Sequence, residues 1–290
     1  MLMGVQVNKT AILLLIAAVL TLLFIYYPSV SSDKQSELSR VNAVENFAKE
    51  ALEDKLRVFG GANEEGKLMN MTWEDIKDSA LHNTKLTLTE EKFELKGFGQ
   101  VYRRECVDSE RESSGTILLL HGAKFNSETW KNLGTLHVMA SYGYRVVAID
   151  LPGGRGETPA GNVPDKADFL INVMSTLKIE NPILISPSMS GGWSLPLIMK
   201  RSDLLKGYLP VAPVDTDKYK DDEYKTNQIQ ALVVYGDKDT ALGSHSALKL
   251  TLLPNGQVHK LKDANHAAYL DQPLEFHRLL HNFADKLFGN

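Results

Sequence analysis

The sequence predicts an α/β fold built on a mostly parallel, eight-stranded sheet. From about residue 85 to the C-terminus, short continuous apolar runs alternate with segments of helical length and pattern. Strands that are apolar on both faces are typical of parallel sheets that helices cover on both sides. The 290 residues are 43% hydrophobic and 23% charged, which is ordinary for a globular protein.

The elements follow one another regularly along the chain. The eight strands are expected at 85–89, 100–107, 116–120, 145–149, 182–185, 208–211, 231–235 and 257–261. Helices are expected at 127–141, 165–178, 189–201, 243–253 and 273–288. The segment 213–229 is short and polar, so we expect little or no cap domain. Catalytic side chains in such sheets follow the carboxyl ends of the strands.

The N-terminal part of the chain predicts a membrane anchor followed by a stalk. Residues 10–27 carry no charge, and a helix over them reaches about 27 Å, close to the thickness of a bilayer core. Tyr26 and Tyr27 are typical of the headgroup region. A cleaved signal peptide is the alternative, because Ser29 and Ser31 have a spacing that signal peptidase accepts. The expected parts are an anchor at 1–28, a polar stalk at 29–84 and an α/β domain at 85–290.

A short N-terminal tail usually stays in the cytosol, so we expect a single-pass, type II membrane protein. Exposure of the domain to the cytoplasm is the alternative, since Lys9 on one side of the apolar run and Lys34 and Arg40 on the other give little charge bias. Asn70-Met71-Thr72 is a glycosylation sequon, so Asn70 is a candidate glycosylation site.

Composition excludes several functional classes. The one cysteine, Cys106, rules out an intrachain disulfide and a cysteine-based zinc cluster, and we expect a buried small side chain rather than a reactive thiol. No zinc-protease, EF-hand or P-loop motif is present, so no metal is expected. The net charge of −4 gives no reason to expect a nucleic-acid partner.

A nucleophile motif follows the strand at 182–185. The stretch Ser186-Pro187-Ser188-Met189-Ser190 has the form small-x-Ser-x-small at a strand-to-helix junction. The general pattern, G-x-S-x-G, places the middle serine on a strained turn above the sheet of an α/β-hydrolase fold, with small residues where the two backbones crowd. Ser188 is therefore the predicted nucleophile. Ser190, in a second frame, is the alternative.

An acid and a base follow in the chain order of that fold, Ser, then Asp or Glu, then His. Asp237 and Asp239 come just after the strand at 231–235, and we prefer Asp239 because it lies further beyond the strand end. His266 lies in the loop between the last strand and the last helix. In the expected chemistry, His266 accepts the proton of Ser188 and Asp239 orients the imidazole.

The remaining machinery is an oxyanion hole. His121-Gly122 follows the strand at 116–120, where such enzymes place one backbone donor, so we assign the N–H groups of Ala123 and Met189. With little cap over the site, the expected reaction is hydrolysis of small acyl esters or acyl-amides rather than long-chain lipids. A non-catalytic interaction protein that keeps the fold is the alternative.

Five phrases resemble the α/β-hydrolase domain-containing protein 14 family. They are LLLHGAKFNSETWKNLGTL, VVAIDLPG, ISPSMSGGWSLP, VVYGDKD and HAAYLDQP, spread from about residue 85 to the end. The hydrophobic N-terminus is similar to the membrane-anchored A member. The resemblance implies a cap-poor hydrolase acting on short acyl esters. For the soluble branch it also implies acetyl transfer from acetyl-lysine to coenzyme A, which makes coenzyme A a candidate acyl acceptor here; no other cofactor is implied.

Overall fold

The computed structural model describes residues 71–289. The predicted anchor at 1–28, the stalk up to residue 70 and the sequon residue Asn70 lie outside the described residues and stay predictions. Within 71–289, no helix combines the length and the apolar character that crossing a bilayer requires.

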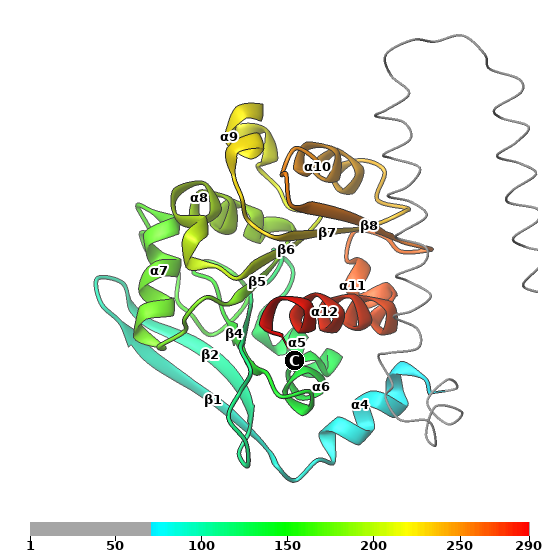
Figure 1. Cartoon of the computed structure of the whole chain (residues 1–290). Helices are drawn as coiled ribbons and strands as arrows, with labels where there is room; N and C mark the ends of the chain where they lie inside the picture. The colour runs from blue at the N-terminus through cyan, green and yellow to red at the C-terminus, as the bar shows by residue number, and fades with distance from the viewer. Residues whose placement is uncertain (1–70, 290) are drawn as a thin grey trace, which may run out of the picture. The chain divides into compact units, whose positions relative to one another are not determined.

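One eight-stranded sheet forms the centre of the described chain (Figure 1). Its strands are β1 (Leu86–Leu95), β2 (Gly99–Asp108), β3 (Thr116–Leu119), β4 (Arg145–Ile149), β5 (Ile183–Pro187), β6 (Gly207–Val211), β7 (Ala231–Gly236) and β8 (Gly256–Leu261). Their order in the sheet is β1-β2-β4-β3-β5-β6-β7-β8. The pairs β1–β2 and β2–β4 are antiparallel and the others are parallel. The predicted mostly parallel sheet is confirmed.

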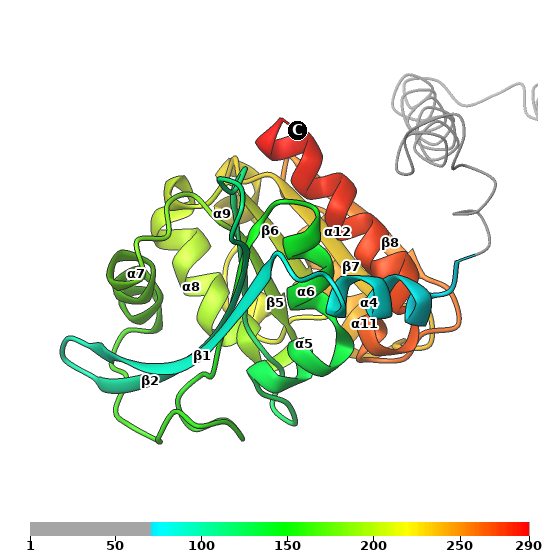
Figure 2. The same ribbon diagram turned by 90° about the horizontal axis from the view of Figure 1, so that it is seen from below.

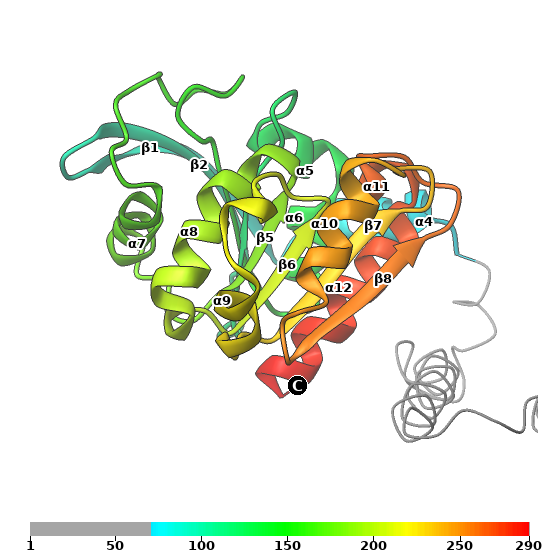
Figure 3. The ribbon, with the colours of Figure 1, turned by 90° about the horizontal axis from the view of Figure 1, so that it is seen from above.

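The helices cover both faces of the sheet. They are α4 (Trp73–Leu81), α5 (Ser127–Leu133), α6 (Thr135–Ser141), α7 (Lys166–Thr176), α8 (Gly191–Arg201), α9 (Asp221–Thr226), α10 (Leu242–Leu250), α11 (Ala268–Asp271) and α12 (Pro273–Phe288). Figure 2 shows α5, α6 and α12 on one side of the strands, and Figure 3 shows α8 and α10 on the other.

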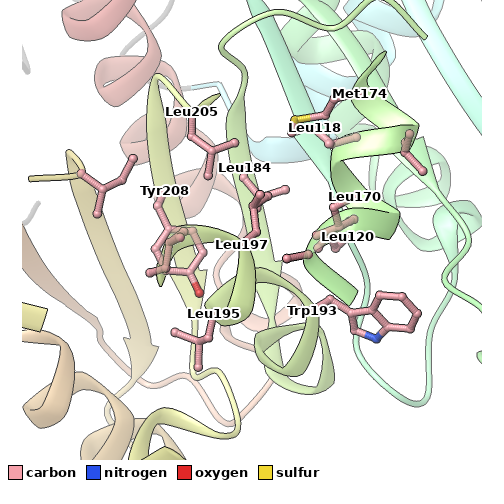
Figure 4. Packing of buried hydrophobic residues seen from close by; sticks show 14 of the residues in the cluster. Leu118, Leu120, Leu170, Met174, Leu184, Trp193, Leu195, Leu197, Leu205 and Tyr208 are labelled. Carbon is pink, nitrogen blue, oxygen red and sulfur yellow. The ribbon is translucent and has the colours of Figure 1, made fainter. Parts of the chain in front are cut away.

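Alternation along the strands explains why both faces are apolar. Side chains of Leu118, Leu184 and Tyr208 enter one buried cluster, with apolar residues of α7, α8 and α10 (Figure 4). Their neighbours Ile183 and Leu209 enter the other cluster, with residues of α5, α6 and α12. Because successive strand residues point to opposite faces, a strand buried on both sides must be apolar at every position.

Two parts of the chain differ from the sequence prediction. The single helix expected at 127–141 is two helices, α5 and α6, because Gly134 takes a left-handed φ of +92° and ends the first one. The segment 213–229 is short, as expected, but it carries α9, whose Tyr224 is fully buried and donates its hydroxyl to the Thr216 carbonyl at 2.8 Å.

Helix α4 lies in the stretch that the sequence assigned to the stalk. Its N-cap is Thr72, which forms a capping box with Asp75. Trp73 is 7% exposed, stacks on the His277 ring at 3.9 Å and donates its indole N–H to the Leu133 carbonyl at 3.2 Å. Helix α4 is therefore packed against the α/β domain rather than separated from it.

Candidate active site

Strand β5 ends in a turn that holds Ser188 in a strained conformation. Ser188 has a φ of +50°, which is uncommon for a residue other than glycine. The 3₁₀ turn Ser188–Ser190 and helix α8 follow directly. At Gly191 a Cβ atom would lie 2.5 Å from the Val214 carbonyl oxygen, so no side chain fits there. This is the strand–turn–helix geometry that the nucleophile motif predicts.

The hydroxyl of Ser188 lies in a hydrogen-bonded chain with a histidine and an aspartate. Its Oγ is 2.8 Å from His266 Nε2, and His266 Nδ1 is 2.6 Å from Asp239 Oδ2. A carboxylate only accepts, so the imidazole N–H is on Nδ1, and Nε2 accepts the Ser188 proton. The Asp239 side chain is 8% exposed and that of His266 44%, so the acid is shielded while the base faces the solvent side.

The structure separates the two alternatives left open by the sequence. Ser190 Oγ is fully buried and donates to the Pro187 carbonyl at 2.7 Å, so it faces away from His266. Asp237 donates its backbone N–H to Leu261 at 2.9 Å, and its Oδ1 is buried with no hydrogen-bond partner among residues 71–289. Of the two aspartates, Asp239 is the one that contacts the imidazole.

The loop after β3 lies directly over the nucleophile. A Cβ on Gly122 would be 3.6 Å from Ser188 Cβ. The Gly122 carbonyl accepts from His121 Nδ1–H at 2.9 Å and from the Phe125 N–H at 3.1 Å. Because a peptide is planar and its C=O and N–H point in opposite directions, these bonds direct the N–H of Ala123 away from them.

His121 connects this loop to the next one. Its Nε2 accepts the backbone N–H of Leu151 at 2.9 Å, and its ring is 1% exposed. Burial lowers the pKa of His121, so the ring stays neutral, with Nδ1 as donor and Nε2 as acceptor. A Cβ on Gly154 would lie 2.6 Å from this ring. In the sequence His121 reads only as part of the loop after β3, and the contacts of its side chain are visible only in the structure.

The second assigned donor, the N–H of Met189, is directed in the same way. The Ser188 carbonyl, which shares its peptide with that N–H, accepts from the Val214 N–H at 3.0 Å. The loop after β6 thus holds the peptide that follows the nucleophile. Within residues 71–289, no group of three or more His, Cys, Asp or Glu is placed to hold a metal ion.

Two further buried residues, Cys106 and Asp150, lie outside the triad. Cys106 is fully buried in β2, and burial raises the pKa of its thiol to about 12, which confirms the small buried side chain. Asp150 is fully buried and accepts the backbone N–H groups of Ser127 and Glu157, each at 2.7 Å, so it braces the loop at the rim.

Curated proteins similar to this chain include ones named ABHD14A and ABHD14B. The mouse protein ABHD14A is 37% identical over 195 residues, which is 66% of this chain and 79% of the mouse protein. Human ABHD14B, named a putative protein-lysine deacylase, is 43% identical over 192 residues, or 64% of this chain and 91% of the human protein. The chain belongs to the ABHD14 family. No family model matches it.

Solved structures confirm the α/β-hydrolase fold. A predicted CIB-like hydrolase from Thermoplasma acidophilum superposes with a TM-score of 0.63 and 24% identity, over 70% of this chain and 100% of that one. The carboxylesterase CesB from Bacillus subtilis gives a TM-score of 0.60 at 14% identity, over 73% and 96%. The ABHD14 relatives, with this fold, support a hydrolase.

Proposed function

We propose that this chain is a serine hydrolase that cleaves small acyl esters or acyl-amides through Ser188, His266 and Asp239, with an acyl-enzyme intermediate. The observation that carries the proposal is the unbroken chain from Ser188 Oγ through both imidazole nitrogens of His266 to the shielded Asp239 carboxylate. Such a chain activates a hydroxyl that is otherwise a poor nucleophile at neutral pH.

The reaction divides into two half-reactions. Ser188 Oγ attacks the acyl carbonyl while His266 Nε2 takes its proton, and Asp239 stabilises the imidazolium. The new oxyanion accepts from the N–H groups of Ala123 and Met189. His266 then gives the proton to the leaving alcohol or amine, which leaves Ser188 acylated. An acceptor gives a proton to His266 and attacks the acyl-enzyme ester, and His266 returns the proton to Ser188 Oγ as the acyl–oxygen bond breaks.

The substrate is proposed to be small because, within residues 71–289, the connection from β6 to β7 supplies little cover over the site. Only residues 212–230 connect β6 to β7, and they carry one turn and the six-residue helix α9. Similarity to a putative protein-lysine deacylase makes acyl-lysine a proposed substrate. Water and the thiol of coenzyme A are the proposed acceptors.

A fluorophosphonate probe tests the proposal on the purified chain. The wild type is expected to be labelled on Ser188, and peptide mapping identifies the labelled residue. Ser188→Ala is expected to abolish labelling, while Ser190→Ala retains it at a reduced rate. A folded wild type that resists the probe would instead favour the alternative, an interaction protein that keeps the fold without the reaction. Release of free acetate or of acetyl-coenzyme A from an acetyl-lysine peptide then identifies the acceptor.

We further propose a type II membrane arrangement with a lumenal domain, carried by the apolar run at 10–27 and the sequon at Asn70. In a secretory cell, a glycosidase-sensitive mass shift that disappears in Asn70→Gln is the expected result. Carbonate-resistant membrane association without any such shift would place the domain in the cytoplasm. Recovery of a shortened chain from the medium would show that the apolar run is a cleaved signal peptide.

A further inference from the structure

Four buried hydroxyl groups form a row beneath the nucleophile turn. Tyr208 OH lies 2.8 Å from Ser194 Oγ, which lies 2.7 Å from Ser186 Oγ. Ser186 Oγ lies 3.0 Å from Ser190 Oγ, and Ser190 Oγ is 2.7 Å from the Pro187 carbonyl oxygen. All four hydroxyl-bearing residues are 0% exposed. The row therefore connects β6 and α8 with the end of β5, where the turn begins.

The last bond determines the direction of all the others. The Pro187 carbonyl can only accept, so Ser190 donates its one hydroxyl proton to that carbonyl. Ser190 must then accept from Ser186, Ser186 from Ser194, and Ser194 from Tyr208. The row is a one-way chain that starts at the Tyr208 hydroxyl. Figure 4 shows that hydroxyl directed toward Leu195, the residue after Ser194.

The end of the chain is the peptide on which the geometry of Ser188 depends. The Pro187 carbonyl and the Ser188 N–H belong to one planar peptide, so a bond to that carbonyl fixes one side of Ser188. The Val214 N–H, 3.0 Å from the Ser188 carbonyl, fixes the other side. A residue at φ +50° keeps that conformation only where its surroundings hold it.

We propose that this hydroxyl chain holds the nucleophile in its reactive conformation, and that Tyr208, which lies on β6 rather than in the turn after β5, is a positioning residue for the reaction. The proposal rests on the proposed function, in which Ser188 is the nucleophile. It explains the two serines that replace the glycines of the usual motif. Ser186 and Ser190 face each other where the backbones crowd, and each is a link of the chain. Buried hydroxyl networks that are fully paired strengthen one another and select one conformation.

A double-mutant cycle tests the proposal. The two single variants are Tyr208→Phe, which removes the first donor without changing the shape of the ring, and Ser190→Ala, which removes the last link. The measurements are the second-order rate of fluorophosphonate labelling and, with p-nitrophenyl acetate, kcat and KM separately. Ser190→Ala is expected to lower the labelling rate and kcat by about tenfold, the effect of one lost hydrogen bond of about 1.4 kcal/mol, with KM unchanged. Tyr208→Phe is expected to lower them by about threefold, because it acts only through the intervening links.

The double variant gives the decisive comparison. Once Ser190 has lost its hydroxyl, Tyr208 is disconnected from Pro187, so Tyr208→Phe added to Ser190→Ala is expected to change neither rate further. Tyr224→Phe is the matched control, because Tyr224 is equally buried and its hydroxyl donates to the Thr216 carbonyl, which is not part of the hydroxyl chain. It is expected to lower the melting temperature and leave kcat unchanged.

The outcomes separate this proposal from the one on which it rests. An unlabelled wild type overturns both. If the wild type is labelled, but the losses of kcat in Tyr208→Phe and Ser190→Ala multiply in the double variant, the proposal of a hydroxyl chain is overturned and the proposed function stands. The same holds for a Tyr208→Phe variant that loses stability as Tyr224→Phe does and keeps its full kcat. If Ser190→Ala fails to fold, Ser194→Ala takes its place in the cycle, since it breaks the same hydroxyl chain at the residue that Tyr208 contacts.

Discussion

Val214 donates its backbone N–H to the carbonyl of Ser188 at 3.0 Å, across the space between the loop after β6 and the nucleophile turn. The approach is this close because Gly191, three residues after Ser188, has no side chain. A Cβ at Gly191 would lie 2.5 Å from the Val214 carbonyl oxygen and 2.7 Å from Pro213 Cβ. The fit of backbone against backbone is therefore part of the site.

Gly191→Ala is expected to lose both stability and activity. The added methyl group meets backbone that cannot move aside, and overpacking of this kind costs about 1–3 kcal/mol. The displaced Val214 N–H releases the peptide that carries the Met189 donor, so labelling of Ser188 slows as well. Urea denaturation and labelling rates check the two effects. Gly192→Ala is the control, because its Cβ would meet the carboxylate end of the Asp215 side chain at 3.0 Å, and a side chain can shift.

The two aspartates after β7 are expected to respond differently to the same substitution. Asp239→Asn keeps the shape but no longer holds the Nδ1–H tautomer, and the analogous change in a serine-protease triad lowers kcat by about 10⁴-fold. Asp237→Asn does not touch the imidazole and is expected to keep kcat within about twofold of the wild type. Steady-state hydrolysis of p-nitrophenyl acetate measures both. Equal losses in the two variants would assign the orienting role to neither residue alone.

Ser188 and His266 could be predicted because the order of strands and loops determines where each belongs. Asp239 was harder to predict, because two aspartates follow β7 and only the three-dimensional turn shows which one reaches His266. Tyr208 reads in the sequence as one more apolar residue of β6, and only its hydroxyl contact with Ser194 reveals a further role. Helix α4 was missed because its helical residues are mostly polar, and its packing depends on Trp73 meeting His277 from a distant part of the chain.

His121 is expected to affect the rate although it does not touch the substrate. His121→Ala removes the bonds to the Gly122 carbonyl and the Leu151 N–H, so the peptide that carries the Ala123 donor is free to rotate. Loss of one oxyanion donor typically lowers kcat by about 10²–10³-fold, and a donor that is only released is expected to cost about 10-fold to 10²-fold. The kcat of His121→Ala, with KM unchanged, is the measurement. A rise in KM alone would instead show that His121 shapes the substrate site.

The length of the acyl group is expected to limit turnover. Residues 212–230 supply no apolar cap over the site, so methylenes beyond the first few carbons stay in water. A methylene that stays in water does not gain the binding free energy of about 0.8 kcal/mol that a buried one gains. A series of p-nitrophenyl esters from acetate to decanoate measures kcat/KM. The expected profile is flat or falling beyond butyrate. A rise of about tenfold for every two added methylenes would reveal an apolar acyl channel and a lipid-like substrate.

The folded chain is expected to become less stable as the pH is lowered, because His277 is buried as a neutral ring. Burial lowers the pKa of His277 from its usual 6.5 to about 4, and its ring accepts from Thr135 while donating to the Pro273 carbonyl at 2.6 Å. Between these two pKa values the unfolded chain binds a proton that the folded chain does not, so the contribution is complete above pH 6.5 and is lost as the pH falls toward 4. The full loss is on the order of 3 kcal/mol.

The measurement is the free energy of unfolding at pH 7.5 and pH 5, for the wild type and for His277→Gln. Glutamine keeps a donor and an acceptor but does not titrate, so the variant is expected to start less stable and to lose less on acidification. Because carboxylates elsewhere titrate equally in both proteins, the difference between the two slopes belongs to His277. Parallel slopes would mean that the ring is protonated in the folded chain at pH 5, which the burial of His277, at 3% exposure, argues against.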